Sequence, residues 1–153
     1  MTKAVPAAEP CIDEVDASCV ETLLGYNARM AALTAIKLFL ERMSVFGLRP
    51  VGFSVLSLIM HNPGITSRQL CKALGLQASN LVAMVNDMEK SGWIERHPHP
   101  QDGRAMGLHP TPQGQAMMKT AEATATQLEL EISSGLNEDE RKTLLGLLKK
   151  VYK

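Results

Sequence analysis

The segment from residue 77 to residue 91 places its polar and apolar side chains at helical spacing. At 100° per residue, an α-helix here would have two contrasting sides. The apolar side would be formed by Leu81, Val85 and Met88. The opposite side would be small, polar or basic, with Ser79, Ala83, Asn86 and Lys90. A face of this size fits the DNA major groove, where hydroxyl and amide groups can hydrogen-bond to base edges.

The start of this helix adds further candidate contacts. Ser79 and Asn80 lie near the helix N-terminus, where free backbone N–H groups also favour phosphate. Gln77, the first residue of the segment, is a candidate DNA contact on the same grounds, whereas Lys90 suits a phosphate better than a base. The alternative for all these polar residues is an ordinary solvated face.

A shorter helical segment precedes this one. Thr66 and Gln69 have the spacing of a capping box, so a helix is expected to begin there and to end at Gly75. A short helix, a glycine-containing turn and a second helix form the outline of a helix-turn-helix. Ser67 and Arg68, at the start of the first helix, are suited to phosphate contacts that set the register on DNA.

After Gly92 the pattern changes from helix to strand. Residues 93–96 and 105–108 read as two short strands. The segment between them is dense in turn residues and contains Asp102-Gly103, a strong hairpin signal. The sequence therefore predicts a winged helix-turn-helix, with a two-strand hairpin as the wing.

Other reactive residue types do not assemble into a site in the sequence. His97 and His99 form a His-x-His pair, but nothing nearby completes a zinc ligand set, so we expect no metal and no cofactor. Cys71 is expected to be a small core residue. Known nucleophile-elbow, phosphate-loop and metalloprotease motifs are absent from the sequence, so we expect no enzyme activity.

The flanking segments are predicted to be helical and strongly apolar. Residues 1–16 read as a loose arm, followed by a helix of about 25 residues ending at Gly47, within an apolar stripe that begins at Val20. A helix from Thr111 to about residue 133 and a last helix capped by Asn137 complete the chain. These stripes are more than one small domain can bury, so residues 17–48 and 111–153 are expected to form a homodimerisation region around a DNA-binding domain at 49–110.

Composition limits the class of protein. Lys plus Arg and Asp plus Glu each number 16, so the formal net charge of the 153-residue chain is zero. Residues 49–110 nevertheless hold six basic and four acidic side chains and all four histidines, which makes this part mildly positive. The sequence shows neither a long apolar run nor a signal-peptide core, so we expect a cytoplasmic protein without membrane contact.

Five motifs in the middle of the chain carry a family resemblance. They lie in order at Asn62–Thr66, Ser79–Val82, Ile94–Arg96, His99–Arg104 and Thr111–Gly114. Together they resemble the MarR family of bacterial winged helix-turn-helix transcriptional regulators, and with the flanking helices the resemblance covers about residues 17–152. It implies a mainly helical fold and a symmetric dimer. The dimer would bind a pseudo-palindromic double-stranded DNA operator and usually repress transcription until a small effector binds.

The resemblance also assigns roles in the wing. Arg104 would enter the minor groove, and Asp102 would orient it through a charge-assisted hydrogen bond. Two departures from the family pattern stand out in the sequence. Gly103 replaces a basic residue and is expected to weaken the grip on phosphate, and Pro110 replaces an apolar residue and is expected to shorten the second strand.

The effector site is less well marked than the DNA site. Family members often hold a small aromatic acid between the dimer helices and the winged domain, and the candidates here are Tyr26, Asn27, Arg29, Met30 and His61. Two alternatives remain open. The first is redox sensing through Cys11 or Cys19, although the neighbouring acidic residues disfavour a reactive thiolate. The second is a winged-helix interaction module that does not read DNA.

Overall fold

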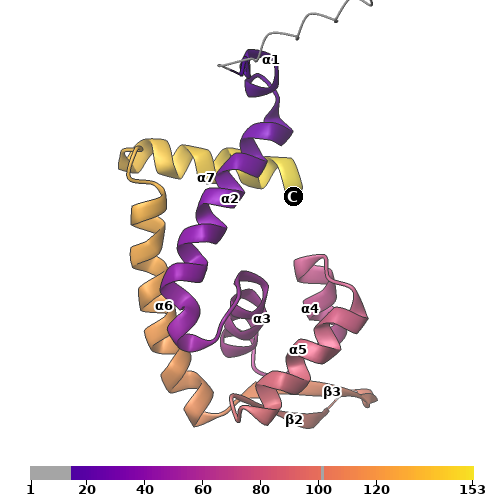
Figure 1. The fold of residues 1–153 in the computed structure, drawn as a ribbon. Coiled ribbons are helices and arrows are strands. Elements are labelled where there is room, and N and C mark those ends of the chain that lie inside the picture. Colours follow the sequence, from indigo (N-terminus) through magenta and orange to yellow (C-terminus); the bar gives the residue numbers. More distant parts are fainter. Residues whose placement is uncertain (1–14, 101) are drawn as a thin grey trace, which may run out of the picture. The chain divides into compact units, whose positions relative to one another are not determined.

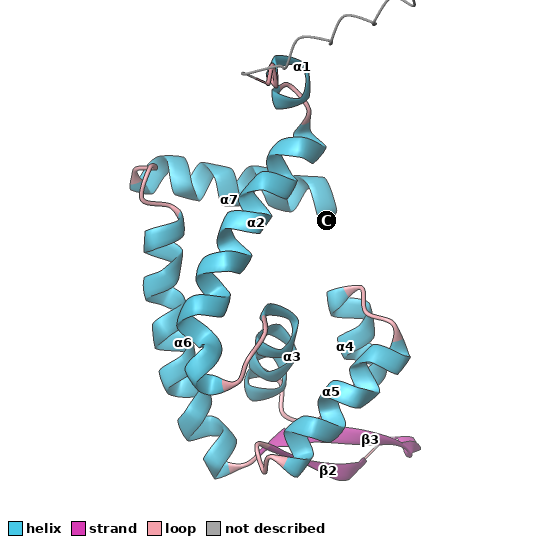
Figure 2. Ribbon diagram, in the orientation of Figure 1, coloured by secondary structure: helices cyan, strands magenta, loops and turns pink. Residues whose placement is uncertain are grey.

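The computed structural model describes residues 15–100 and 102–153, with residues 102–104 described by their backbone alone. The chain divides into two compact units, residues 1–33 and 34–153. Most of the described chain is helical, and its strands form one small sheet (Figure 2). The predicted class, mainly helical with a winged helix-turn-helix centre, is confirmed.

The first unit contains α1 (Ser18–Glu21) and the start of α2 (Leu24–Met43). The sequence did not predict α1 as a separate helix. The break between the two helices is stabilised by the side-chain amide of Asn27, which donates to the backbone oxygens of Glu21 (2.7 Å) and Leu23 (2.9 Å). The Leu23 carbonyl also accepts from the Asn27 backbone N–H at 3.2 Å, so Asn27 holds the start of α2 through both main chain and side chain and has a structural role.

The predicted end of the long helix is confirmed at Gly47. The α2 helix stops at Met43 and continues as a 3-10 turn, η1 (Ser44–Phe46). Gly47 then ends the segment in the left-handed conformation, with φ of 65°. This conformation is one that glycine adopts without steric cost.

In the part of the chain that the structure describes, no one helix has the length and apolar character to cross a bilayer. One bent pair, Leu24–Phe46 with Pro50–His61 at 62°, has enough length and apolar content taken together.

The second unit contains the helix-turn-helix and the hairpin. Its elements after η1 are α3 (Pro50–His61), β1 (Ile65–Thr66), α4 (Ser67–Leu74), α5 (Ala78–Lys90), β2 (Ile94–His99), β3 (Asp102–Pro110), α6 (Pro112–Ile132) and α7 (Glu138–Tyr152). The two predicted capping boxes are both present, one at Thr66–Gln69 and one at Asn137–Glu140. The hairpin of β2 and β3 lies beside α5 (Figure 1).

The sheet has three antiparallel strands in the order β1-β3-β2. The sequence predicted only β2 and β3, because β1 has two residues and is defined by its pairing of Ile65 with Leu108. The expected shortening at Pro110 is wrong, since β3 runs to Pro110 opposite Ile94. Proline lacks an N–H, but the next residue, Thr111, donates its own to the Trp93 carbonyl at 3.0 Å and continues the pairing.

One apolar core joins these elements. Its buried members include Val55, Leu56, Ile59, Leu70, Leu81, Val85, Ile94, Leu108, Met118 and Ala121. They come from α3, α4, α5, α6 and both hairpin strands. The core therefore fixes the recognition-type helix α5 and the root of the hairpin against one common support.

The start of α6 is joined tightly to the loop before β2. The Thr111 hydroxyl accepts from the Gly114 N–H at 3.0 Å and donates to the Gly92 carbonyl at 2.6 Å. Gly114 is buried with its Cα hydrogens facing the Trp93 backbone, where a Cβ would overlap the carbonyl oxygen. This junction requires glycine because main chain meets main chain there.

We expect Gly114→Ala to lower the free energy of unfolding by about 1–3 kcal/mol, the usual cost of overpacking a closed site. Denaturant unfolding followed by circular dichroism measures this loss. Gly25→Ala is the matched control, because Gly25 is helical and an added Cβ there would meet no other atom within 4 Å. Equal stability of the two variants would contradict the role assigned to this junction.

Candidate nucleic-acid interface

The α5 helix presents the face that the sequence predicted. Leu81, Val85 and Met88 are buried in the core. The predicted contacts Gln77, Ser79, Asn80, Ala83 and Lys90 are all exposed. The leading half of the helix thus offers small polar side chains to solvent, together with Val82, which is 52% exposed.

Gln77 is the N-cap residue of α5, but its side chain makes no capping hydrogen bond. The Gln77 side chain therefore does not cap its own helix. The N–H groups of the first turn lie next to it, at the positive end of the helix dipole. An anionic group is favoured at this end of α5.

Asn86 departs from the predicted pattern. It is half-buried, and its amide oxygen accepts from Arg96 Nη2 at 2.6 Å. The same guanidinium pairs with Glu89 through Nη1 and Oε2 at 2.7 Å. Arg96 belongs to the Ile94–Arg96 motif, but the sequence assigns no role to Arg96 or Glu89, and it predicts an Asn86 side chain that is free to contact a base.

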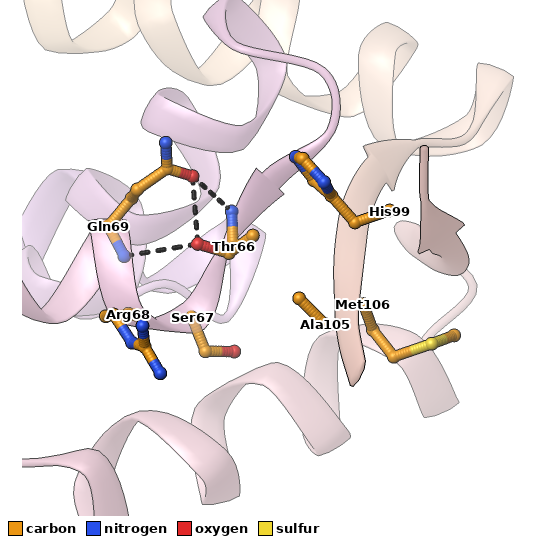
Figure 3. Close-up of a pocket in the computed structure, with 7 residues that line it drawn as sticks. All are labelled: Thr66, Ser67, Arg68, Gln69, His99, Ala105 and Met106. Carbon is orange, nitrogen blue, oxygen red and sulfur yellow. Dashed lines mark hydrogen bonds between the residues drawn. The ribbon is translucent and has the colours of Figure 1, made fainter. Parts of the chain in front are cut away.

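A second polar surface lies at the start of α4. A pocket of about 700 Å³ is lined there by Thr66, Ser67, Arg68, Gln69, His99, Ala105 and Met106 (Figure 3). Ser67 and Arg68 are exposed on the α4 side, whereas the last three residues belong to the hairpin strands. The pocket therefore opens between the helix start and the wing.

The capping box fixes the geometry of this helix start. The Gln69 side-chain oxygen lies 2.9 Å from both the backbone nitrogen and the hydroxyl of Thr66 (Figure 3). In return, the Gln69 N–H donates to the Thr66 hydroxyl at 3.4 Å. The capping box fixes the start of α4, on which Ser67 and Arg68 are exposed to solvent.

The wing carries the remaining predicted DNA contacts. The backbone of Asp102 and Arg104 lies in β3, but the side chains of both residues lie outside the described part of the structure. Their contact with each other and with the minor groove therefore stays a prediction. The register of the hairpin is irregular between Pro98 and His99, so its outer part departs from the regular ladder of its root.

The predicted effector residues fall in separate places in the chain. Tyr26, Arg29 and Met30 lie on the part of α2 in the first unit, with Tyr26 half-buried and the other two exposed. His61 ends α3 in the second unit, where its Nε2 lies 2.9 Å from Glu122 Oε1. The effector site stays a prediction.

The cysteines and histidines do not form a metal site in the described residues. No cluster of three or more His, Cys, Asp or Glu side chains able to hold a metal ion occurs there. Cys19 is exposed on α1, Cys71 is half-buried against the core, and Cys11 lies outside the described residues. His97 instead pairs with Glu95 at 2.9 Å and stacks edge-on against His109 at 4.8 Å.

Comparison with known proteins extends this description. A family model described as the MarR family matches residues 46–105, from η1 into β3. A putative transcriptional regulatory protein for the hcr operon of Thauera aromatica is 32% identical, over 85% of this chain and 79% of that protein. The multiple antibiotic resistance protein MarR of Escherichia coli is 33% identical, over 84% of this chain and 90% of its own.

A solved structure of a transcriptional repressor, CouR, bound to a 23-mer DNA duplex is also similar to this chain. It is 32% identical and superposes with a TM-score of 0.85, covering 92% of this chain and 99% of that one. The similarity therefore includes the flanking helices as well as the helix-turn-helix and the wing.

Proposed function

The chain belongs to the MarR family of transcriptional regulators, and from that premise we propose that it is a repressor that binds a pseudo-palindromic operator as a homodimer and is released by a small effector. The observation that carries this proposal is the exposed leading half of α5. Ser79, Asn80 and Ala83 are small enough to enter the major groove, and the core holds the rest of the helix. The similar repressor CouR was solved bound to a DNA duplex, which supports DNA binding by this chain.

Phosphate contacts on both sides of α5 would set the register. Ser67 and Arg68 at the start of α4 would bind backbone phosphates on one side of the groove. Lys90 at the far end of α5 would bind a backbone phosphate on the other side. Arg104 at the tip of the hairpin would enter the neighbouring minor groove, oriented by Asp102. Because the formal net charge is zero, these local cations would supply the attraction, and affinity should fall steeply with salt.

The C-terminal helix supports the proposed dimer. None of the residues of α7 is buried in the single chain. Five of its aliphatic side chains are exposed: Leu144, Leu145, Leu147, Leu148 and Val151. A second copy would cover such a surface, and a twofold axis would then place two α5 helices on half-sites about 34 Å apart.

The proposed effector is a small aromatic acid. Arg29 would pair with its carboxylate, while Tyr26 and Met30 would provide an adaptable apolar wall. His61, the candidate in the second unit, would have to exchange its contact with Glu122 to bind a ligand. Binding would release DNA by favouring a dimer conformation in which the two α5 helices no longer match the half-site spacing.

We expect Arg104→Ala to weaken binding to an operator by about 1–3 kcal/mol, because it removes the minor-groove contact. Fluorescence anisotropy on fragments of the DNA flanking the coding region measures this loss. Lys119→Ala is the control, since Lys119 is an exposed cation that belongs to α6 and not to α5 or the hairpin. Unchanged affinity after Arg104→Ala would favour an interaction module that does not read DNA.

We expect Leu148→Glu to yield monomers and to weaken operator binding by about 100-fold or more, because the second half-site is lost. Light scattering after size-exclusion chromatography gives the mass, and anisotropy gives the affinity. The control on the same helix is Lys142→Ala, which removes only the exposed ion pair with Glu138. A Leu148→Glu protein that stays dimeric would remove α7 from the proposed interface.

We expect at least one aromatic carboxylate in a panel of such acids to dissociate the operator complex. Arg29→Ala should bind the operator with unchanged affinity but require about tenfold more of that acid, because the charge partner is gone. Titration of each acid into the labelled complex gives both values. A panel without any release, or an unchanged response of Arg29→Ala, would count against this effector site.

A further inference from the structure

Arg96 connects the hairpin to the recognition helix through two partners on α5. Its Nη1 lies 2.7 Å from Glu89 Oε2, and its Nη2 donates to Asn86 Oδ1 at 2.6 Å. Asn86 and Glu89 are three residues apart, so they lie one above the other on the same side of the helix. A planar guanidinium held at two points has one orientation, which a single contact would not impose.

The bridge is partly shielded from solvent. The side chains of Arg96 and Glu89 are 30% and 38% exposed, whereas those of the surface pair Arg42 and Glu131 are 56% and 46% exposed. Charge-assisted hydrogen bonds of this length are stronger than neutral ones, and reduced solvent contact weakens their screening. The connection between β2 and α5 is therefore more than a loose surface ion pair.

Arg96 lies near the base of the hairpin, where the bridge can set the direction of the whole hairpin. Arg96 lies opposite Leu108, which is buried and also pairs with Ile65 of β1. This is the rooted part of the sheet, and the irregular register begins beyond it, between Pro98 and His99. A constraint at the root sets the direction in which the tip with Arg104 projects.

We propose that Arg96 is a positioning residue for DNA binding: it holds the wing at a fixed angle to α5, so that Arg104 reaches the minor groove while α5 occupies the major groove. This role rests on the proposed function. Arg96 acts without touching DNA, and Asn86 acts with it as part of the bridge. Because the bridge already holds the wing in place, DNA binding does not incur the entropy cost of orienting it. The full free energy of the Arg104 contact then contributes to the affinity.

A double-mutant cycle between Arg96 and Arg104 tests this proposal, with operator affinity measured by anisotropy at one salt concentration. In the unmodified chain, Arg104→Ala should weaken binding about tenfold. In an Arg96→Gln background it should weaken binding about twofold or less, because a misaligned wing contributes little to begin with. Ser79→Ala should cost the same factor in both backgrounds, since it reports on α5 alone.

Arg42→Gln is the matched control, because it removes an Arg–Glu pair at 2.9 Å that joins α2 to α6. It should leave the tenfold cost of Arg104→Ala unchanged. If Arg96→Gln does not fold, the same cycle is measured with Glu89→Gln, which weakens the bridge from the helix side.

An equal cost of Arg104→Ala with and without the bridge would overturn the role of Arg96 and leave the proposed function intact. Absence of operator binding by the unmodified chain would overturn both. Arg96→Gln could instead lower the thermal stability while Arg104→Ala costs the same factor in both backgrounds. That result would identify a purely structural ion pair and overturn the role of Arg96.

Discussion

The rotation of α5 about its own axis is fixed by the burial of Leu81, Val85 and Met88, and the rest of the interface depends on it. Each of these side chains is at most 4% exposed, and burial of a side chain of this size is worth about 1.5–3 kcal/mol. A turn of one residue, 100°, would move all three toward water. The small polar residues of the leading half are therefore held outward by the core on the opposite side of the helix, without any contact of their own.

The hairpin is held at two levels, and the two differ in kind. At its base the connection is mostly main chain, because the Thr111 N–H donates to the Trp93 carbonyl and the buried Gly114 packs directly against the Trp93 backbone. Farther along, the connection between the hairpin and α5 is made by the side chain of Arg96. Main-chain packing fixes where the hairpin begins, and the side-chain bridge is placed where it can fix the direction in which the hairpin points.

The features that the sequence predicted are those governed by nearby residues. Both capping boxes span four residues, and the buried side of α5 follows from helical periodicity. The hairpin was predicted as well, but the Asp102-Gly103 pair expected in its turn belongs to β3, because the strands extend farther than residues 93–96 and 105–108. The two-residue strand β1 was missed because its strand character comes from a partner more than 40 residues away, at Leu108. Asn86 was placed on the correct helix, but its partner Arg96 lies on another element, and periodicity gives the direction of a side chain without its contacts.

The proposed dimer would account for both the zero net charge and the exposed helix α7. Residues 49–110 carry only two more cations than anions, a small excess for a protein that must hold a polyanion. A symmetric dimer presents this excess twice and joins two weak contacts into one strong one, provided that the connection between them is stiff. In the proposed dimer the apolar side chains of α7 would offer that connection, because a second copy, and not DNA, would bury them. The spacing of the two half-sites would then be set by the dimer, and charge would determine mainly the rate and salt dependence of binding.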